Sequence, residues 1–234
     1  ATSNKTSLKT AALVSGLGLL IMVVTSPIAE LYIFPKLISS GNAAQTVKNI
    51  YDHMPMFVMG IFDYLITFIA DIVVAWALYI FLKPVSKNLS LLTALFRLEY
   101  TVIALMALLN LVAAFRFLTT PTYRTLFAQD GFNNQILVSY YTFKSYWYFG
   151  ILFFAIHLGL LGYLSLISKY IPKILGILLL VSALGYLLTT VQPFFFPGKR
   201  IDFAKYTFYG ELFFMLWLLI KGWRVQVKTD AGEI

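Results

Sequence analysis

The sequence contains no cysteine and only two histidines, His53 and His157. Without thiols the chain cannot form disulfides, iron–sulfur clusters or cysteine-ligated zinc sites, and two imidazoles are too few for a three-histidine metal site. Charged residues are also scarce, at 12% of 234 residues, against about 25% in a soluble domain. These shortages exclude a disordered chain, a nucleic-acid-binding arm and a conventional soluble enzyme, and we expect no metal and no cofactor.

Apolar residues, by contrast, are abundant. They make up 60% of the chain, with 21 Phe and 15 Tyr among them. A soluble domain of this length could not bury so much apolar surface in one core, so the solvent of this protein is largely lipid. The net charge of +8 comes from Lys and Arg that lie mostly between apolar runs. We therefore expect the partners of these charges to be the headgroups of membrane lipids and not nucleic acid.

Six apolar runs are long enough to cross a membrane, which takes about 20 mostly apolar residues per helix. They cover about residues 10–34, 54–82, 89–117, 143–166, 171–195 and 206–220, with an earlier start near Gln135 as the alternative for the fourth. Pro27 is expected to kink the first run in its outer part. The sequence therefore predicts an all-α fold: a polytopic transmembrane helix bundle with six spans, in which residues 1–234 form a single transmembrane domain.

Basic residues at the span ends predict the orientation. Six spans place both termini on one side of the membrane. The Lys and Arg counts nearly balance, with nine on the side of the termini and eight on the other. The links around Lys83 and Lys169 are short, however, and the positive-inside rule weights short loops most heavily. Both termini are therefore predicted to be cytoplasmic, in the cytoplasmic (inner) membrane of a bacterium.

Two longer links lie on the outer side. The first, residues 41–54, has apolar residues at helical spacing and Asn42 as an N-cap. It therefore predicts a short outer amphipathic helix that lies on the membrane surface or caps the bundle. The second, residues 121–135, is expected to be a loop with a turn at Asp130–Gly131. An aromatic belt follows, formed by Tyr140, Tyr141, Tyr146, Trp147 and Tyr148. Such belts anchor most membrane proteins at the interface, and an aromatic ligand cage is the alternative.

Several segments carry a family resemblance. They are PKLISSGNAAQTVKNIY, LYIFLKPVSKNLSLL, IPKILGILLLVSALGYLL and FYGELFFMLWLLIKG. Together they resemble an uncharacterised family of bacterial multi-spanning membrane proteins, a domain of unknown function. The resemblance covers nearly the whole chain and implies the six-span fold but no reaction. Members of that family tend to carry His-Ser-Tyr near the start of the fourth span. Lys144, Ser145 and Tyr146 stand there in this chain, so no imidazole role is expected at that place.

Ionisable and polar residues within the spans are the candidates for a site, because they are costly in hydrocarbon and tend to face a bundle interior or a cavity. Three of them follow one another at i, i+4 and i+8 on the second span and form one polar stripe. Two more lie eleven residues apart on one face of the third span, and one lies near the middle of the sixth. The candidate ligand-binding residues are Asp63, Thr67, Asp71, Glu99, Asn110 and Glu211.

Two interpretations of these side chains stay open. In the structural interpretation, the acids are protonated or paired inside the bundle and serve packing. Arg97 is then either an ion-pair partner of Asp71 or extends to the cytoplasmic headgroups. His157 and Glu30 belong with this interpretation. In the functional interpretation, the acids of three spans converge on one polar cavity that suits a cationic or hydrogen-bonding solute, or protons.

No catalytic residue is assigned, because no nucleophile motif, metal-ligand spacing or Gly-rich phosphate loop is present. Gly159, Gly162 and Gly176 fit close helix contacts better. The leading hypothesis is the binding or translocation of a small solute or lipid through an acid-lined intramembrane cavity. The alternative is a non-catalytic accessory subunit or receptor that contacts another membrane protein. An intramembrane enzyme is the third hypothesis, since paired carboxylates can perform acid–base chemistry.

Overall fold

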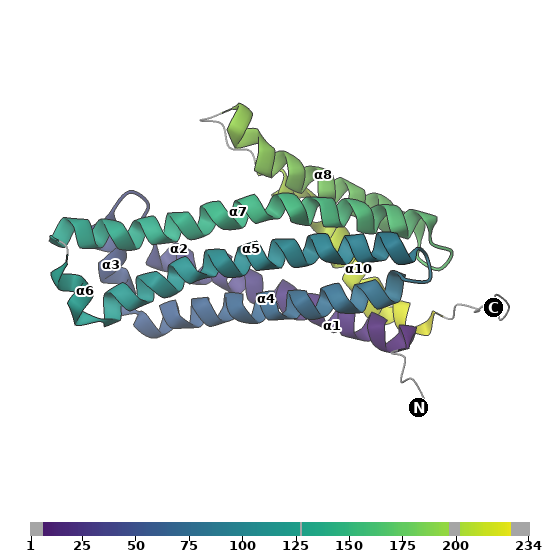
Figure 1. Cartoon of the computed structure of the whole chain (residues 1–234), viewed down its shortest axis with the longest axis horizontal. Coiled ribbons are helices and arrows are strands. Elements are labelled where there is room, and N and C mark those ends of the chain that lie inside the picture. The colour runs from purple at the N-terminus through teal and green to yellow at the C-terminus, as the bar shows by residue number, and fades with distance from the viewer. Residues whose placement is uncertain (1–6, 127, 197–201, 226–234) are drawn as a thin grey trace. The chain divides into compact units, whose positions relative to one another are not determined.

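The computed structural model describes residues 7–126, 128–196 and 202–225, and every regular element within these ranges is a helix (Figure 1). The helices are α1 (Leu8–Pro27), a π-helical segment (Ile28–Ile33), α2 (Phe34–Leu37), α3 (Ala43–Asp52), α4 (Met54–Leu82), α5 (Lys87–Thr119), α6 (Pro121–Thr125), α7 (Gln129–Ile167), α8 (Lys173–Phe195), α9 (Ala204–Thr207), α10 (Tyr209–Ile220) and a 3-10 turn (Gly222–Arg224). The all-α prediction is confirmed.

Five helices in the described ranges are long and apolar enough, by length and composition, to cross a membrane. They are Leu8–Leu37, Met54–Leu82, Lys87–Thr119, Gln129–Ile167 and Lys173–Phe195. Five of the six predicted spans are thus helices of membrane-spanning length, and α4 has the predicted bounds. The remaining predicted span, 206–220, is divided between α9 and the 12-residue α10.

Helix α7 begins well before the predicted span and includes part of the predicted loop. Gly131, which was expected to form a turn with Asp130, lies in the first turn of this helix. The Phe132 N–H donates to the Ala128 carbonyl at 2.9 Å. Phe132 and Ile136 are both buried. Burial of these side chains therefore outweighs the turn preference of the Asp-Gly pair.

The first span changes its hydrogen-bond spacing at Pro27. Proline has no N–H to donate to the preceding turn, and its ring crowds the carbonyl four residues earlier. Helix α1 ends at this residue, and the chain continues as the π-helical segment. The Phe34 N–H then donates to the carbonyl of Ala29, five residues earlier. The predicted disturbance of the helix is thus a widened turn, and Glu30 lies within it.

The predicted amphipathic helix is α3. The side chain of Asn42 caps it and accepts a hydrogen bond from the Gln45 N–H at 2.9 Å. Val47 and Ile50 are buried on one face. Lys48 and Asp52 form an exposed ion pair on another face. This helix is confirmed as amphipathic, and its location on the outer membrane surface stays a prediction.

The helices divide between two compact units. Unit 1 comprises Ala1–Leu20, Asp71–Tyr100 and Ile151–Ile234, and unit 2 comprises Ile21–Ala70 and Thr101–Gly150. Within unit 1, α8 packs against α9 and α10 (Figure 1). Helices α7 and α8 approach closely, because a Cβ atom on Gly176 would lie 2.8 Å from the Gly162 carbonyl oxygen. The predicted close contact is confirmed at these two glycines, whereas a Cβ atom on Gly159 would lie 3.9 Å from Ala183 Cβ, an ordinary contact distance.

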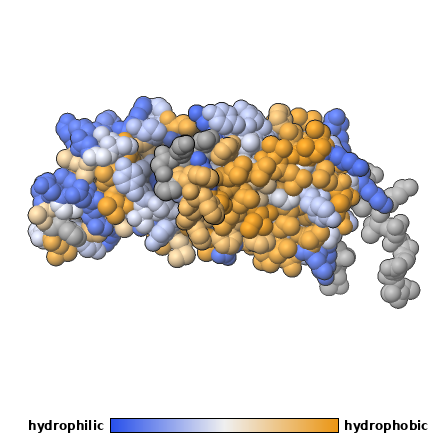
Figure 2. Space-filling model, turned by 90° about the horizontal axis from the view of Figure 1, so that it is seen from above, coloured by the Kyte–Doolittle hydropathy of each residue, from blue (hydrophilic) through white to orange (hydrophobic). Residues whose placement is uncertain are grey.

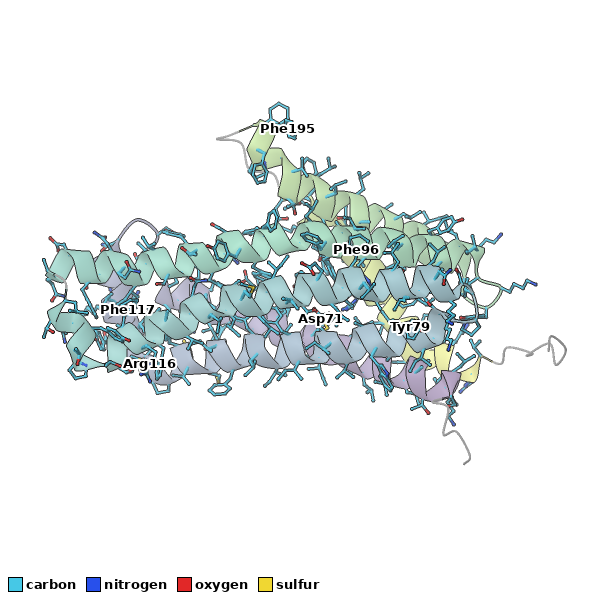
Figure 3. The ribbon with its side chains drawn as sticks, in the orientation of Figure 1. Asp71, Tyr79, Phe96, Arg116, Phe117 and Phe195 are labelled. Atoms are coloured by element: carbon cyan, nitrogen blue, oxygen red, sulfur yellow. The ribbon has the colours of Figure 1, made fainter. Side chains whose placement is uncertain are left out.

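Helix α8 also presents an apolar face outward. Figure 2 shows hydrophobic side chains gathered over it. The exposed residues recur at helical spacing: Ile174, Ile177, Val181, Leu184 and Leu188. Phe195 extends this apolar surface at the end of the helix (Figure 3). A face of this kind suits contact with lipid chains.

Tyr170 lies in the link between α7 and α8 and connects this link to α4 within unit 1. Its hydroxyl donates to the Phe81 carbonyl at 2.6 Å. Burial raises the pKa of this hydroxyl above its ordinary value, so the phenol keeps its proton and remains a donor throughout the neutral range.

Candidate functional site

A buried group of ionisable side chains lies within unit 1 and is centred on Arg97 of α5. The Arg97 Nε donates to Asp71 Oδ1 at 2.6 Å, and Nη1 donates to Glu211 Oε1 at 2.8 Å. Asp71 comes from α4 (Figure 3) and Glu211 from α10. The side chains of Arg97 and Asp71 are 0% exposed and that of Glu211 is 20% exposed. The guanidinium therefore joins three helices away from solvent.

His157 of α7 is the fourth member of this group. Its Nε2 lies 3.0 Å from Arg97 Nη1, and its Nδ1 lies 2.8 Å from the Thr93 carbonyl oxygen. A guanidinium can only donate hydrogen bonds, so Nε2 is the acceptor. The ring proton is therefore on Nδ1, which donates a hydrogen bond to the Thr93 carbonyl. The imidazole is therefore neutral, and both of its nitrogens are fixed. We refer to Arg97, Asp71, Glu211 and His157 as the Arg97 cluster.

The residues of α5 that contribute to the cluster lie on one face of that helix. Thr93 and Arg97, four residues apart, are both buried, whereas Glu99 is exposed on the same helix. The ring of Phe154, one turn before His157 on α7, lies 5.4 Å from the Arg97 Cζ atom. An aromatic face attracts a cation that has lost its water. With both carboxylates ionised, the cluster has two negative charges and one positive charge.

Hydroxyl groups of α8 bond to backbone groups at the start of α9 and at the break between α9 and α10. The Ser182 hydroxyl donates to the Thr207 carbonyl and accepts from the Gly210 N–H, the latter at 3.1 Å. The Thr189 hydroxyl accepts from the Ala204 N–H at 2.9 Å. Buried backbone groups need such partners where water is absent. The break sets Glu211 in the first turn of α10, where the helix dipole stabilises a carboxylate.

A second ion pair lies within unit 2. The Lys144 ammonium on α7 donates to both carboxylate oxygens of Glu30, at 2.8 and 2.7 Å. The Tyr64 hydroxyl donates to Glu30 Oε1. The ammonium also lies 4.6 Å from the ring centroid of Trp147 and 5.3 Å from that of Tyr148. We call Glu30, Tyr64, Trp147 and Tyr148 the Glu30 cage, and Lys144 occupies it.

Packed aromatic rings hold this cage in place. The buried ring of Phe34 stacks on Tyr64 with 5.5 Å between centroids, and Tyr64 meets Trp147 edge-on at 5.5 Å. Phe143 packs against both Tyr64 and Trp147. Gly60 permits the approach of Phe34, because a Cβ atom there would lie 3.0 Å from Phe34 Cε2. Trp147 of the predicted aromatic belt therefore packs against the buried rings of unit 2 and is only partly exposed.

The six candidate residues fall into two groups. Asp71 and Glu211 meet in the Arg97 cluster. Glu99 is also in unit 1, but it is exposed on α5. The other three belong to unit 2 and are described with it: Asp63, Thr67 and Asn110.

In unit 2 the three candidates make separate contacts. Thr67 Oγ1 lies 2.6 Å from Thr25 Oγ1 and so links α4 to α1. The Asn110 side-chain amide donates to the Ala107 carbonyl of its own helix at 3.0 Å. Asp63 Oδ2 is buried and has no hydrogen-bond partner among the described residues. Their part in ligand binding stays a prediction.

The sequence left Glu30, Lys144 and His157 outside the set of candidates. Glu30 and Lys144 are opposite charges near the outer ends of their predicted spans, and comparing their depths would have suggested a pair. For His157 the sequence offers no comparable indication of a partner, because the residues on either side of it in the chain are apolar. Within the described part of the chain, no three His, Asp or Glu side chains are placed to hold a metal ion.

The long apolar helices and the charged groups buried between them define a multi-pass helical membrane protein. The chain belongs to the family described as a domain of unknown function, DUF4386, which matches residues 14–222. An uncharacterized protein of Archaeoglobus fulgidus is 36% identical over 165 residues, which cover 70% of this chain and 83% of the relative. No solved structure matches the chain. The family predicted from the sequence is confirmed, and its matched range contains both the Arg97 cluster and the Glu30 cage.

Proposed function

We propose that this protein binds a small cationic or hydrogen-bonding solute, or a lipid, and moves it across the membrane, with Asp71 and Glu211 as polar groups of the site. Glu211 gives the strongest support, because its partly exposed carboxylate is bonded to a fully buried guanidinium. Ionisable groups within a membrane are costly and tend to mark solute or proton pathways. Arg97 balances only one of the two carboxylates. A cation bound at the exposed side of Glu211 would balance the other negative charge.

Charge accounting supports a role beyond packing. A structural ion pair needs one acid for one base, and Asp71 already supplies that acid to Arg97 at 2.6 Å. His157 is neutral by its hydrogen bonds. Glu211 is therefore the acid in excess, and its charge is available to a cation or a proton. The accessory-subunit and enzyme hypotheses stay predictions from the sequence.

We propose six crossings in a single transmembrane domain, with α9 and α10 together as the sixth. Helix α10 alone is about 18 Å long at 1.5 Å per residue, shorter than the roughly 30 Å hydrocarbon core. Residues 204–220 together number 17, the lower end of the usual range of about 17–25. Ser182 bonds to the Gly210 N–H at the break, and Thr189 bonds to the Ala204 N–H at the start of α9. Both termini then lie on one side, which we propose to be the cytoplasmic side of a bacterial inner membrane.

The natural absence of cysteine allows a direct test of this topology. We expect single substitutions Ser3→Cys and Thr229→Cys to react with a membrane-impermeant maleimide from the same side in oriented vesicles. Labelling from opposite sides would show an odd number of crossings and contradict the six-span proposal. The parent chain, with no thiol, is the blank.

Proton flux tests the function without knowledge of the solute. Proteoliposomes with trapped pyranine and an imposed potassium diffusion potential should change internal pH faster than empty liposomes. We expect Glu211→Gln to remove this flux, since the amide cannot bind a proton or a cation as a carboxylate does. Glu99→Gln is the matched control, because it removes an exposed acid of the same unit. Undiminished flux in Glu211→Gln would contradict the proposal.

A further inference from the structure

Lys144 places its ammonium where an organic cation would be recognised. Two carboxylate oxygens of Glu30 accept from it at 2.8 and 2.7 Å. The rings of Trp147 and Tyr148 lie 4.6 and 5.3 Å from it. The Tyr64 hydroxyl donates to Glu30 and fixes the direction of the carboxylate. A carboxylate with aromatic faces beside it is the combination that binds ammonium groups of ligands.

A second lysine ion pair of unit 2 shows what an ordinary surface pair looks like in this protein. Lys48 and Asp52 lie 3.8 Å apart, and their side chains are 70% and 54% exposed. The Lys144 side chain is only 16% exposed and that of Glu30 is 27% exposed. A lysine that only extends toward headgroups would keep its ammonium hydrated. The Lys144 ammonium is therefore largely enclosed by the Glu30 cage, while Glu30 itself keeps some exposed surface.

We propose that the Glu30 cage binds the primary ammonium group of a ligand, and that Lys144 is the tethered occupant of the cage when no ligand is present. The ligand class is a primary organic ammonium, which is either a free amine or the amino headgroup of a lipid. This site shares no residue with the Arg97 cluster, so it does not depend on the proposed translocation function.

The exchange of one ammonium for another keeps the charge of the site constant. Glu30 is never left as an unpaired, partly buried carboxylate, which is the costly outcome when one partner of such a pair is lost. Lysine suits this role because its ammonium is a point charge on a flexible four-carbon stem. The exposed part of Glu30 provides the path of entry. An arginine held by several directed hydrogen bonds could not withdraw as easily.

Ethanolammonium is the probe, because it represents both a free amine and a lipid headgroup. The variant Lys144→Ala removes four non-hydrogen atoms, the same number that ethanolammonium contains. By isothermal titration calorimetry in detergent, we expect this variant to bind ethanolammonium with 1:1 stoichiometry and the parent chain to bind it at least tenfold more weakly. Ethylene glycol, which has the same size without the charge, should not bind. Lys48→Ala should bind like the parent chain.

The double variant Lys144→Ala with Glu30→Gln should lose ethanolammonium binding while it keeps its helical circular dichroism. Nanodiscs then identify the source of the amine. If phosphatidylethanolamine in the nanodisc blocks free ethanolammonium, the headgroup occupies the cage; if it does not, a soluble amine does, and both results support the site. A folded Lys144→Ala protein that does not bind ethanolammonium would overturn the proposal, and so would binding that survives Glu30→Gln.

Discussion

Unit 1 and unit 2 each enclose a cation, but they hold it in different ways. In unit 1, Arg97 meets two carboxylates and an imidazole and has no exposed surface. In unit 2, Lys144 meets one carboxylate and two aromatic rings and keeps some exposure. The planar guanidinium presents several donors in fixed directions, whereas the ammonium is a compact charge on a flexible stem.

The difference separates a fixed cation from an exchangeable one. Withdrawal of Arg97 would leave Asp71 and Glu211 together without a counter-charge, so the guanidinium must stay in place. Withdrawal of Lys144 exposes a single carboxylate that another ammonium can pair with. The Arg97 cluster is therefore a rigid support in which Glu211 is the partly accessible member, and the Glu30 cage is a site that can change its occupant.

Removal of Arg97 should give the largest loss of stability. We expect Arg97→Leu to lower the free energy of unfolding by about 3–5 kcal/mol, because both acids lose their buried ion pair with the guanidinium. Denaturant or thermal unfolding in detergent measures this. Arg116→Leu is the matched control on the same helix, since Arg116 is exposed (Figure 3). Equal losses in both variants would remove the distinction between a buried and a surface arginine.

Neutralising Asp71 should have the next largest effect. Asp71→Asn keeps the size of the side chain but weakens a fully buried, charge-assisted hydrogen bond, which is worth about 1.5–3 kcal/mol. Glu211→Gln should cost less, because Glu211 is 20% exposed and its loss leaves Arg97 and Asp71 balanced. The same unfolding measurement compares the two variants. A greater cost for Glu211→Gln would reverse the roles assigned to these acids.

Removal of Lys144 should rank third. We expect Lys144→Leu to cost about 1–2 kcal/mol, between the values for surface and fully buried ion pairs. Glu30 keeps the hydroxyl of Tyr64 and some contact with solvent, which limits the loss. If Lys144→Leu destabilised the protein as much as Arg97→Leu, the ammonium would be as fixed as the guanidinium.

The exposed pair on α3 should give the smallest effect. Lys48→Ala should change the free energy of unfolding by less than about 0.5 kcal/mol, as is usual for an i,i+4 surface pair. Raising the salt concentration should reduce even this difference. A measured cost above that of Lys144→Leu would contradict the ranking by burial.

The long apolar helices could be predicted because their length and composition are set locally. Residues 54–82 form α4 as expected, and Asn42 caps α3. The start of α7 could not be predicted, since tertiary burial of Phe132 decides it. The break before α10 could not be predicted either, because Ser182 of another helix supplies the hydrogen-bond partners for the backbone groups at the break.

The sequence predicted several residues of the site, but it predicted few of the contacts between them. The presence of acids within apolar runs identified Asp71 and Glu211, and an Arg97–Asp71 pair was one of two alternatives for Arg97. The sequence gives no rotation for one helix relative to another, so it could not show that His157 faces Arg97 or that Glu99 is exposed. Glu30 and Lys144 are 114 residues apart in the chain, and their similar depth in the predicted spans is the one sequence signal for the pair.

Proton flux through proteoliposomes that contain Glu211→Gln or Lys144→Ala tests the central claim most directly, namely that the accessible acid of the Arg97 cluster carries the function. The two variants change one charge each, in different units. We predict that flux is lost in Glu211→Gln and retained in Lys144→Ala, with both proteins folded by circular dichroism. Retained flux in Glu211→Gln would contradict the account.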